Sequence, residues 1–79
     1  MKFPRKEVNA EFGRFIKKIR TERGITQMEM CEQIGIQQPY YSCLESGQRV
    51  IDFYVALRIC DVLNVSVDDF VSQYKNPVD

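Results

Sequence analysis

Several side chains in the middle of the chain can exchange hydrogen bonds without carrying charge. Gln38 has an amide that donates and accepts at once, which matches the N6 and N7 edge of adenine in the major groove of DNA. Tyr40 and Ser42 follow it with hydroxyls that suit a backbone phosphate. These groups offer the chemistry of recognition, and their use depends on the elements that present them.

Two short helices joined by a tight turn are predicted around these residues. Thr26 begins the first helix with a T-x-x-E capping box. Gly35 permits the positive φ of the turn, and Pro39 places the start of the second helix near Gln37 or Gln38, because proline is tolerated in a first helical turn. This layout is that of a helix-turn-helix, whose second helix lies in the major groove of DNA.

The whole chain is predicted to form one compact all-α domain, residues 1–79, with five helices and no strands. Residues 1–8 are expected to be a flexible arm, and a first helix is expected from about Asn9 to Arg23, ended by Gly24. Residues 71–79 are expected to be a short C-terminal tail, with the ordered chain ending at Asn76-Pro77.

Two further helices are predicted after the helix-turn-helix. Asp52 caps a fourth helix, which Asn64 stops. This helix is expected to bury Phe53, Ala56, Leu57, Cys60 and Leu63. Ser66 and Asp69 form a second capping box, which begins a fifth helix that buries Val67 and Phe70.

Composition excludes several classes of protein. No apolar run approaches the ~20 residues of a membrane span, and no secretory signal follows the N-terminus, so a reducing cytoplasm is expected. The three cysteines form no CxxC pair and the chain has no histidine, so no metal site is expected. Without a glycine-rich phosphate loop or a nucleophile beside a base, we expect no enzyme, no cofactor and no small-molecule ligand.

The formal net charge of zero conceals an uneven distribution. Residues 1–26 carry eight basic and three acidic side chains, whereas the remainder of the chain is net acidic. A basic first third can still present one positive face to a phosphate backbone. The alternative is an ordinary solvated mixture of surface charges.

The segment from Thr26 to Gly47 resembles the lambda-repressor-like (Cro/repressor type, XRE) helix-turn-helix family. The positions that match the family pattern are Thr26, Gln27, Glu29, Gly35, Gln38, Ser42, Leu44, Glu45 and Gly47. The resemblance extends from about Phe12 to Phe70. It implies a sequence-specific DNA-binding transcriptional regulator, with repression by blocking polymerase as the default mechanism.

The resemblance also implies roles for individual residues. Gln38 matches a glutamine that commonly contacts a base, and Cys43 matches a base-reading position where a thiol offers only van der Waals contact. Gln37 stands where serine or threonine is usual, so it either extends the readout or caps the helix poorly. The remaining candidate DNA contacts are Gln27, Tyr40, Ser42, Ser46, Gln48 and Arg49. Arg20 and Glu45 match a largely buried ion pair.

A homodimer on a pseudo-palindromic double-stranded DNA operator is expected, because the reading segment has no basic residue. The apolar side chains expected at its interface are Tyr54, Val55, Val62, Val71 and Tyr74. Alternatively, the C-terminal tail folds over some of them. The uncharged reading helix also leaves open a protein–protein interaction module of the same fold, such as an antitoxin or regulatory subunit.

Overall fold

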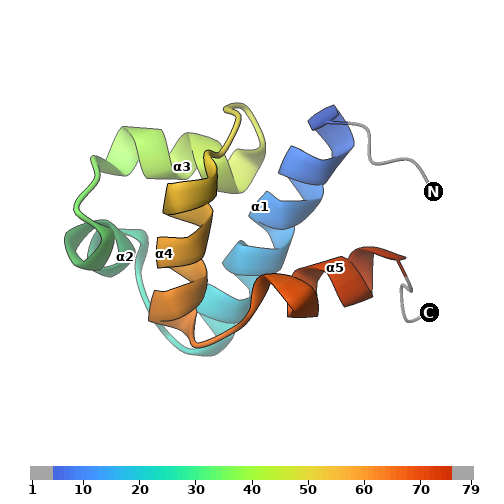
Figure 1. The fold of residues 1–79 in the computed structure, drawn as a ribbon. Helices are drawn as coiled ribbons and strands as arrows, with labels where there is room; N and C mark the ends of the chain where they lie inside the picture. Colours follow the sequence, from blue (N-terminus) through green and yellow to red (C-terminus); the bar gives the residue numbers. More distant parts are fainter. Residues whose placement is uncertain (1–4, 76–79) are drawn as a thin grey trace.

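The computed structural model describes residues 5–75, which form helices joined by short loops (Figure 1). The helices are α1 (Arg5–Glu22), α2 (Gln27–Ile34), α3 (Gln38–Ser46), α4 (Phe53–Leu63) and α5 (Val67–Lys75). No strand occurs in this range, and the all-α, five-helix prediction is confirmed. α1 packs against α3, α4 and α5, while α2 packs against α3 and α4.

The two terminal helices are longer than the sequence suggested. α1 begins at Arg5 instead of Asn9, so residues 5–8 are helical and not part of an arm, and Val8 is packed against the core. α5 continues to Lys75, so residues 71–75 are helical as well. Residues 1–4, and the expected end of the ordered chain at Asn76-Pro77, lie outside the described residues.

The predicted helix starts and stops are confirmed where local chemistry sets them. The Thr26 hydroxyl accepts from the Glu29 N–H at 3.1 Å, and the Glu29 carboxylate accepts from the Thr26 N–H at 2.8 Å. Ser66 and Asp69 repeat this reciprocal box at the start of α5. Gly35 closes α2 with a φ of 85°, a conformation that glycine adopts without steric cost.

α1 and α3 approach closely because Gly13 has no side chain. A Cβ on Gly13 would lie 2.3 Å from the backbone oxygen of Glu45 and 2.7 Å from that of Leu44. A second close approach lies one turn away, where a Cβ on Gly47 would be 2.9 Å from the Cα of Ala10. The end of α3 is therefore seated directly on the backbone of α1.

The predicted buried face of α4 is partly wrong. Cys60 and Leu63 are buried as expected, but Phe53 is 73% exposed and Leu57 is 43% exposed, and Ala56 is half-buried. The other core residues of α4 are Val55 and Ile59. All positions from 53 to 63 except Arg58 and Asp61 are apolar, so several helical faces show an apolar period and only packing selects one.

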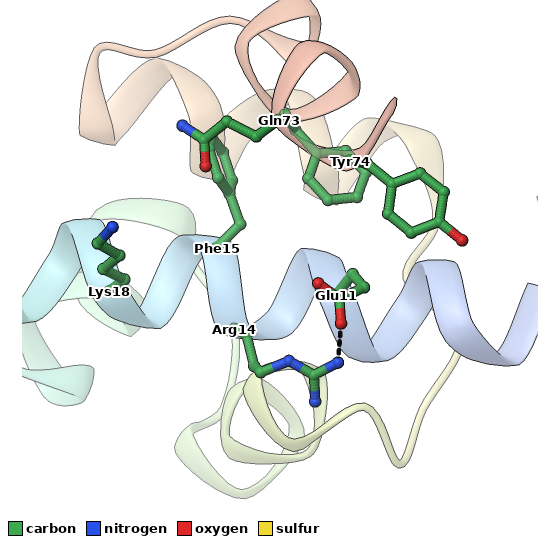
Figure 2. Close-up of a pocket in the computed structure, with 7 residues that line it drawn as sticks. Glu11, Arg14, Phe15, Lys18, Gln73 and Tyr74 are labelled. Carbon is green, nitrogen blue, oxygen red and sulfur yellow. Dashed lines mark hydrogen bonds and ion pairs between the residues drawn. The ribbon is translucent and has the colours of Figure 1, made fainter. Parts of the chain in front are cut away.

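An aromatic cluster joins α1 to α5. The Phe12 and Phe70 rings meet edge to face at 5.1 Å between centroids, and Phe15 lies 5.4 Å from Phe70. Beside this cluster runs a shallow groove of about 450 Å³ between the two helices. Figure 2 shows Phe15 extending from α1 toward α5 and the ion pair between Arg14 and Glu11. The cluster anchors the last helix to the first.

Candidate nucleic-acid interface

The outer face of α3 is polar and exposed at the positions predicted to contact DNA. Gln38, Ser42 and Ser46 are exposed, and Tyr40 and Cys43 are half-buried. Gln37 is the N-cap of α3, but its side chain makes no capping hydrogen bond. Because the Gln37 side chain is exposed and makes no capping hydrogen bond, its amide is available to other partners. Gln37 is therefore a poor cap, and its position is compatible with a role in reading a base.

The loop after α3 folds back onto the same helix. The backbone N–H of Gln48 donates to the carbonyl of Cys43 at 2.9 Å, and the Cys43 thiol donates to the Gln48 side-chain oxygen at 3.8 Å. The Ser46 hydroxyl donates to the Cys43 carbonyl at 3.2 Å. The first two contacts hold Gln48 against the second half of α3, whereas Ser46 is itself the last residue of α3.

Arg49 stacks on the ring of Tyr40, a contact that we did not expect from the sequence. Its guanidinium carbon lies 5.4 Å from the ring centroid, within the range of a cation–π interaction. α3 carries one charged residue, Glu45, and that residue is buried. The stack therefore places a positive charge beside the otherwise neutral outer face of α3.

Glu45 lies at the centre of a buried network that joins three helices, called here the Glu45 hub. Arg20 from α1 donates to both carboxylate oxygens, at 2.5 Å through Nε and 3.0 Å through Nη2. The Tyr41 hydroxyl donates at 2.5 Å, and the Gln27 amide of α2 donates at 3.0 Å. Arg20 also donates to the carbonyl of Ile25, in the loop before α2. The expected ion pair is present in the structure and is part of this larger hub.

The hub sets the charge state of its members. Burial raises the pKa of Glu45, but hydrogen bonds from Arg20, Tyr41 and Gln27 outweigh this effect, so its pKa lies below the ordinary carboxyl value. The Glu45 carboxylate raises the pKa of Arg20, and burial, helped by Glu45, raises the pKa of Tyr41. Glu45 is therefore an ionised acceptor, and its partners are protonated donors.

Gln27 lies between the hub and the surface. It is the first residue of α2 and is half-buried. The N-terminus of a helix attracts anions through its free N–H groups and its dipole. Gln27 therefore lies at the end of α2 where an anion would be favoured, and one of its amide N–H groups is already bonded to Glu45.

Basic side chains of the first third lie on α1 and the loop that follows it. Arg14, Lys17, Lys18 and Arg23 are exposed, although Arg14 is ion-paired with Glu11. Arg20 is withdrawn into the hub, where it is 7% exposed. Positive charge at the proposed interface therefore depends on Arg49 and on neighbours of α3, not on α3 itself.

The residues predicted for a dimer interface differ widely in their burial. Val55 is 6% exposed and belongs to the core, so its assignment to an interface was wrong. Val62, Val71 and Tyr74 are partly buried against the core, and Tyr54 is 66% exposed. Tyr54 instead lies among other exposed apolar residues at the start of α4. We call the set of Val50, Phe53, Tyr54 and Leu57 the α4 patch.

Sequence reasoning missed several features of this region. Tyr41 was expected to need a hydroxyl partner, but its bond to Glu45 was not identified. The bond between Gln27 and Glu45 joins residues 18 positions apart, which no local pattern reveals. Gly13 gave a usable signal, because a glycine inside a helix often marks a close backbone approach.

Two features of the described residues bear on other functions. No helix among residues 5–75 has the length and apolar character needed to cross a bilayer. Within the same part of the chain, no three His, Cys, Asp or Glu side chains are placed to hold a metal ion together.

The sequence is similar to bacterial regulators. A family model described as helix-turn-helix matches residues 16–70. An uncharacterized HTH-type transcriptional regulator of Bacillus subtilis (strain 168), YqaE, is 35% identical over 57 residues, which are 72% of this chain and 49% of that protein. The SPbeta prophage-derived regulator YonR of the same organism is 33% identical over 57 residues, covering 72% and 53%. The chain spans about half the length of these curated relatives.

Solved structures share the fold. The restriction-modification controller protein C.AhdI from Aeromonas hydrophila superposes with a TM-score of 0.74 at 22% identity, covering 81% of this chain and 96% of that one. The clp gene regulator ClgR from C. glutamicum superposes with a TM-score of 0.80 at 22% identity, covering 91% and 94%.

Since the family model spans all of α2, α3 and α4, the chain belongs to the helix-turn-helix family of the lambda-repressor-like type.

Proposed function

We propose that this domain is a sequence-specific transcriptional regulator that reads the major groove of DNA with α3. The observation that carries the proposal is the exposed polar face of α3, with Gln38 in its first turn, on a helix whose inner side is fixed by the Glu45 hub. A rigid helix with neutral donors and acceptors at its N-terminal end suits the edges of base pairs. Gln38 is proposed to contact adenine, with Gln37 and Cys43 beside it.

The proposed phosphate contacts surround this face. Gln27 approaches from the start of α2, and Arg49 approaches from the loop after α3, where the Tyr40 ring supports it. Ser42, Ser46 and Gln48 provide neutral donors between them. Such contacts position a protein on the duplex, while the base contacts provide the specificity.

Repression by occupying a promoter is the proposed mode of action, because it requires only binding. The cytoplasm is the proposed compartment, since DNA is the partner and the free thiols of Cys31, Cys43 and Cys60 suit reducing conditions.

We also propose that two copies bind together through the α4 patch. Its four side chains are between 43% and 73% exposed, and exposed apolar residues gathered in this way mark interaction surfaces. The patch begins directly after Arg49, so a two-fold axis through it would bring the two α3–α4 loops together. Two reading helices on one DNA face, about 34 Å apart, would then read a pseudo-palindrome. Tyr54 remains in this proposed interface, whereas Val62, Val71 and Tyr74 lie at most at its edge.

Selection from random DNA tests the reading function. The parent should enrich one pseudo-palindromic site, and Gln38→Ala should relax the preference at one base pair in each half-site. Gln33→Ala, an exposed glutamine at the far end of α2, should leave the selected site unchanged. A folded parent that enriches no sequence would contradict DNA reading.

Sedimentation tests the dimer. Phe53→Asp and Leu57→Asp should shift the protein to monomer, whereas Met28→Asp, at a 58% exposed apolar position outside the α4 patch, should not. A dimer that survives both patch substitutions has its interface elsewhere, and a parent that is monomeric at tens of micromolar and selects an asymmetric site is not a dimer.

The second candidate, an interaction module for another protein, is favoured by one observation. The described outer face of α3 has no charge of its own, while the α4 patch nearby is apolar. Failure of the selection experiment, together with loss of a copurifying partner in Phe53→Asp, would support this alternative.

A further inference from the structure

The carboxylate of Glu45 has a complete set of hydrogen-bond donors. An ionised carboxylate offers about four acceptor positions, and here four donors occupy them: Arg20 through two nitrogens, Tyr41 and Gln27. Glu45 is 5% exposed, so water has little access to it. Each donor is therefore held firmly, because no other group is available to replace it.

Gln27 differs from the other donors because it is the only one of the three residues that is not buried. Arg20 and Tyr41 lie inside the domain, whereas Gln27 is half-buried at the start of α2. One N–H of its amide thus bonds to the hub, while the residue as a whole keeps part of its surface in solvent. Any molecule that contacts this amide is linked through one carboxylate to α3 and to α1.

The chemistry of Glu45 also determines which way the Gln27 amide faces. An ionised carboxylate can only accept, so the amide must present its nitrogen to Glu45, because an oxygen in that place would be repelled. A free surface glutamine can exchange the positions of its nitrogen and oxygen and samples many rotamers. Glu45 removes both freedoms before any ligand arrives.

We propose that Glu45 is a positioning residue for DNA binding, which orients the Gln27 amide so that its second N–H is ready to donate to a backbone phosphate. This inference rests on the proposed DNA-binding function. Pre-ordering one long side chain avoids its ordering cost on binding, which corresponds to about two- to tenfold in affinity. The hub thus sets the orientation of α3 and one phosphate contact of α2 together.

Nuclear magnetic resonance of the free protein tests the positioning step directly. The Gln27 side-chain amide signals are identified by their loss in Gln27→Met. One of the two amide protons should be shifted downfield and should exchange slowly with water, because it is bonded to a buried carboxylate. On addition of the selected DNA, the other proton should shift. Two fast-exchanging Gln27 protons, like those of exposed Gln33, would overturn the proposal.

A second experiment tests the phosphate contact. Selected DNA is prepared with single phosphates replaced by neutral methylphosphonates, one at a time. Gln27→Met should weaken binding to unmodified DNA by about tenfold, since hydrogen bonds to charged groups are the stronger class. At the phosphate that Gln27 contacts, the methylphosphonate should weaken DNA binding by the parent. The same methylphosphonate should cause no further loss of affinity in Gln27→Met. Gln27→Lys, which keeps donors for both anions, should restore most of the affinity.

Control variants separate this role from simple stabilisation. Ile59→Val removes a methylene from the buried core, outside the hub, so it should lower the melting temperature but leave DNA affinity unchanged where the protein is folded. Equal affinity of Gln27→Met and the parent would show that the hub is only structural and would overturn the proposal. A weakened Gln27→Met with two unprotected amide protons in the parent would overturn the positioning while leaving DNA reading intact.

Discussion

The two faces of α3 use opposite chemistry. The inner face carries Tyr41, Leu44 and the charged Glu45, all buried, and the carboxylate is fully hydrogen-bonded. The outer face carries Gln38 and Ser42, both exposed and neutral. The charge on this helix therefore fixes its position, whereas the described outer face offers a partner only uncharged groups.

This difference has a physical advantage for a reading helix. A buried carboxylate with four donors tolerates little displacement, because each lost bond leaves an unsatisfied buried group. Neutral amides and hydroxyls on the outside gain little from a phosphate backbone of any sequence and more from a matched base edge. Inner-face substitutions should therefore change the free energy of unfolding, and outer-face substitutions should change DNA binding alone.

The largest expected effect is on the inner face. Glu45→Ala leaves the guanidinium of Arg20, which is 7% exposed, without its charged partner. Removing one member of a buried ion pair costs about 3–5 kcal/mol of unfolding free energy, a large part of the ~5–15 kcal/mol that stabilises a typical domain. Urea denaturation measures the loss, with exposed Glu32→Ala as the matched control. If both variants unfold at the same urea concentration as the parent, the hub contributes nothing.

Low pH should reduce the contribution of the inner face to stability without any mutation. Because hydrogen bonds lower the pKa of Glu45 in the folded state, its contribution to stability is fully present above the ordinary carboxyl value of 4.5. That contribution is lost as the pH falls below this value and through the folded pKa. The thermal midpoint should therefore fall steeply below pH 4.5, and more steeply in the parent than in Tyr41→Phe, where one of the bonds that lower the pKa is missing.

The contact between α1 and the end of α3 gives the next largest effect. Gly13→Ala improves helix propensity by about 1 kcal/mol, so local reasoning predicts a more stable protein. Packing predicts the reverse, because the new Cβ would lie 2.3 Å from a backbone oxygen, and overpacking costs about 1–3 kcal/mol or more. We expect packing to dominate, since backbone atoms cannot move aside as a flexible side chain would. Thermal denaturation decides whether Gly13→Ala stabilises or destabilises the protein. A raised midpoint would show that α1 and α3 can separate freely.

Local signals predicted the boundaries of the inner helices and the start of α5, because the chemistry that sets them spans four residues or fewer. The Thr26–Glu29 and Ser66–Asp69 boxes and the Gly35 turn are complete in the sequence itself. The buried face of α4 was mispredicted because its sequence is apolar on nearly every side. Only the position of α1 and α2 decides that Val55, and not Phe53, enters the core.

The site was predictable to the extent that a residue's exposure follows from its helix. The exposed positions of Gln38 and Ser42 are confirmed, and the pairing of Arg20 with Glu45, implied by the family resemblance, is confirmed as well. The additional bonds to Glu45 and the stacking of Arg49 on Tyr40 depend on tertiary placement. Gln27 and Glu45 are 18 residues apart, and Tyr40 and Arg49 are also distant in the sequence, so no period or capping rule indicates these two contacts. Tyr41 and Glu45 are four residues apart on one helix, a spacing at which side chains can meet, and this bond was the one that sequence reasoning could have found.

On the outer face, base reading and phosphate contact should separate. Gln38→Ala should weaken binding to the selected site by about 1–3 kcal/mol and relax one position in each half-site. Arg49→Ala should weaken binding to all sequences and lower the slope of log affinity against log salt by about one. Titrations of selected and scrambled DNA at several salt concentrations measure both. Neither variant should change the urea midpoint, and a large shift in either would break the distinction between the two faces.

The smallest expected effect concerns the edge of the outer face of α3, where Arg49 stacks on the ring of Tyr40. Tyr40→Leu removes the ring under the guanidinium and should weaken DNA binding by about 0.5–1 kcal/mol, the range of an exposed cation–π pair, beyond any loss of a hydroxyl contact. Tyr40→Phe keeps the ring and removes only the hydroxyl, so the difference between the two variants isolates the stack. In an Arg49→Ala background that difference should vanish, because the ring then has no cation to hold. If it persists, Tyr40 acts on the DNA by itself, and Arg49 is positioned by its loop alone.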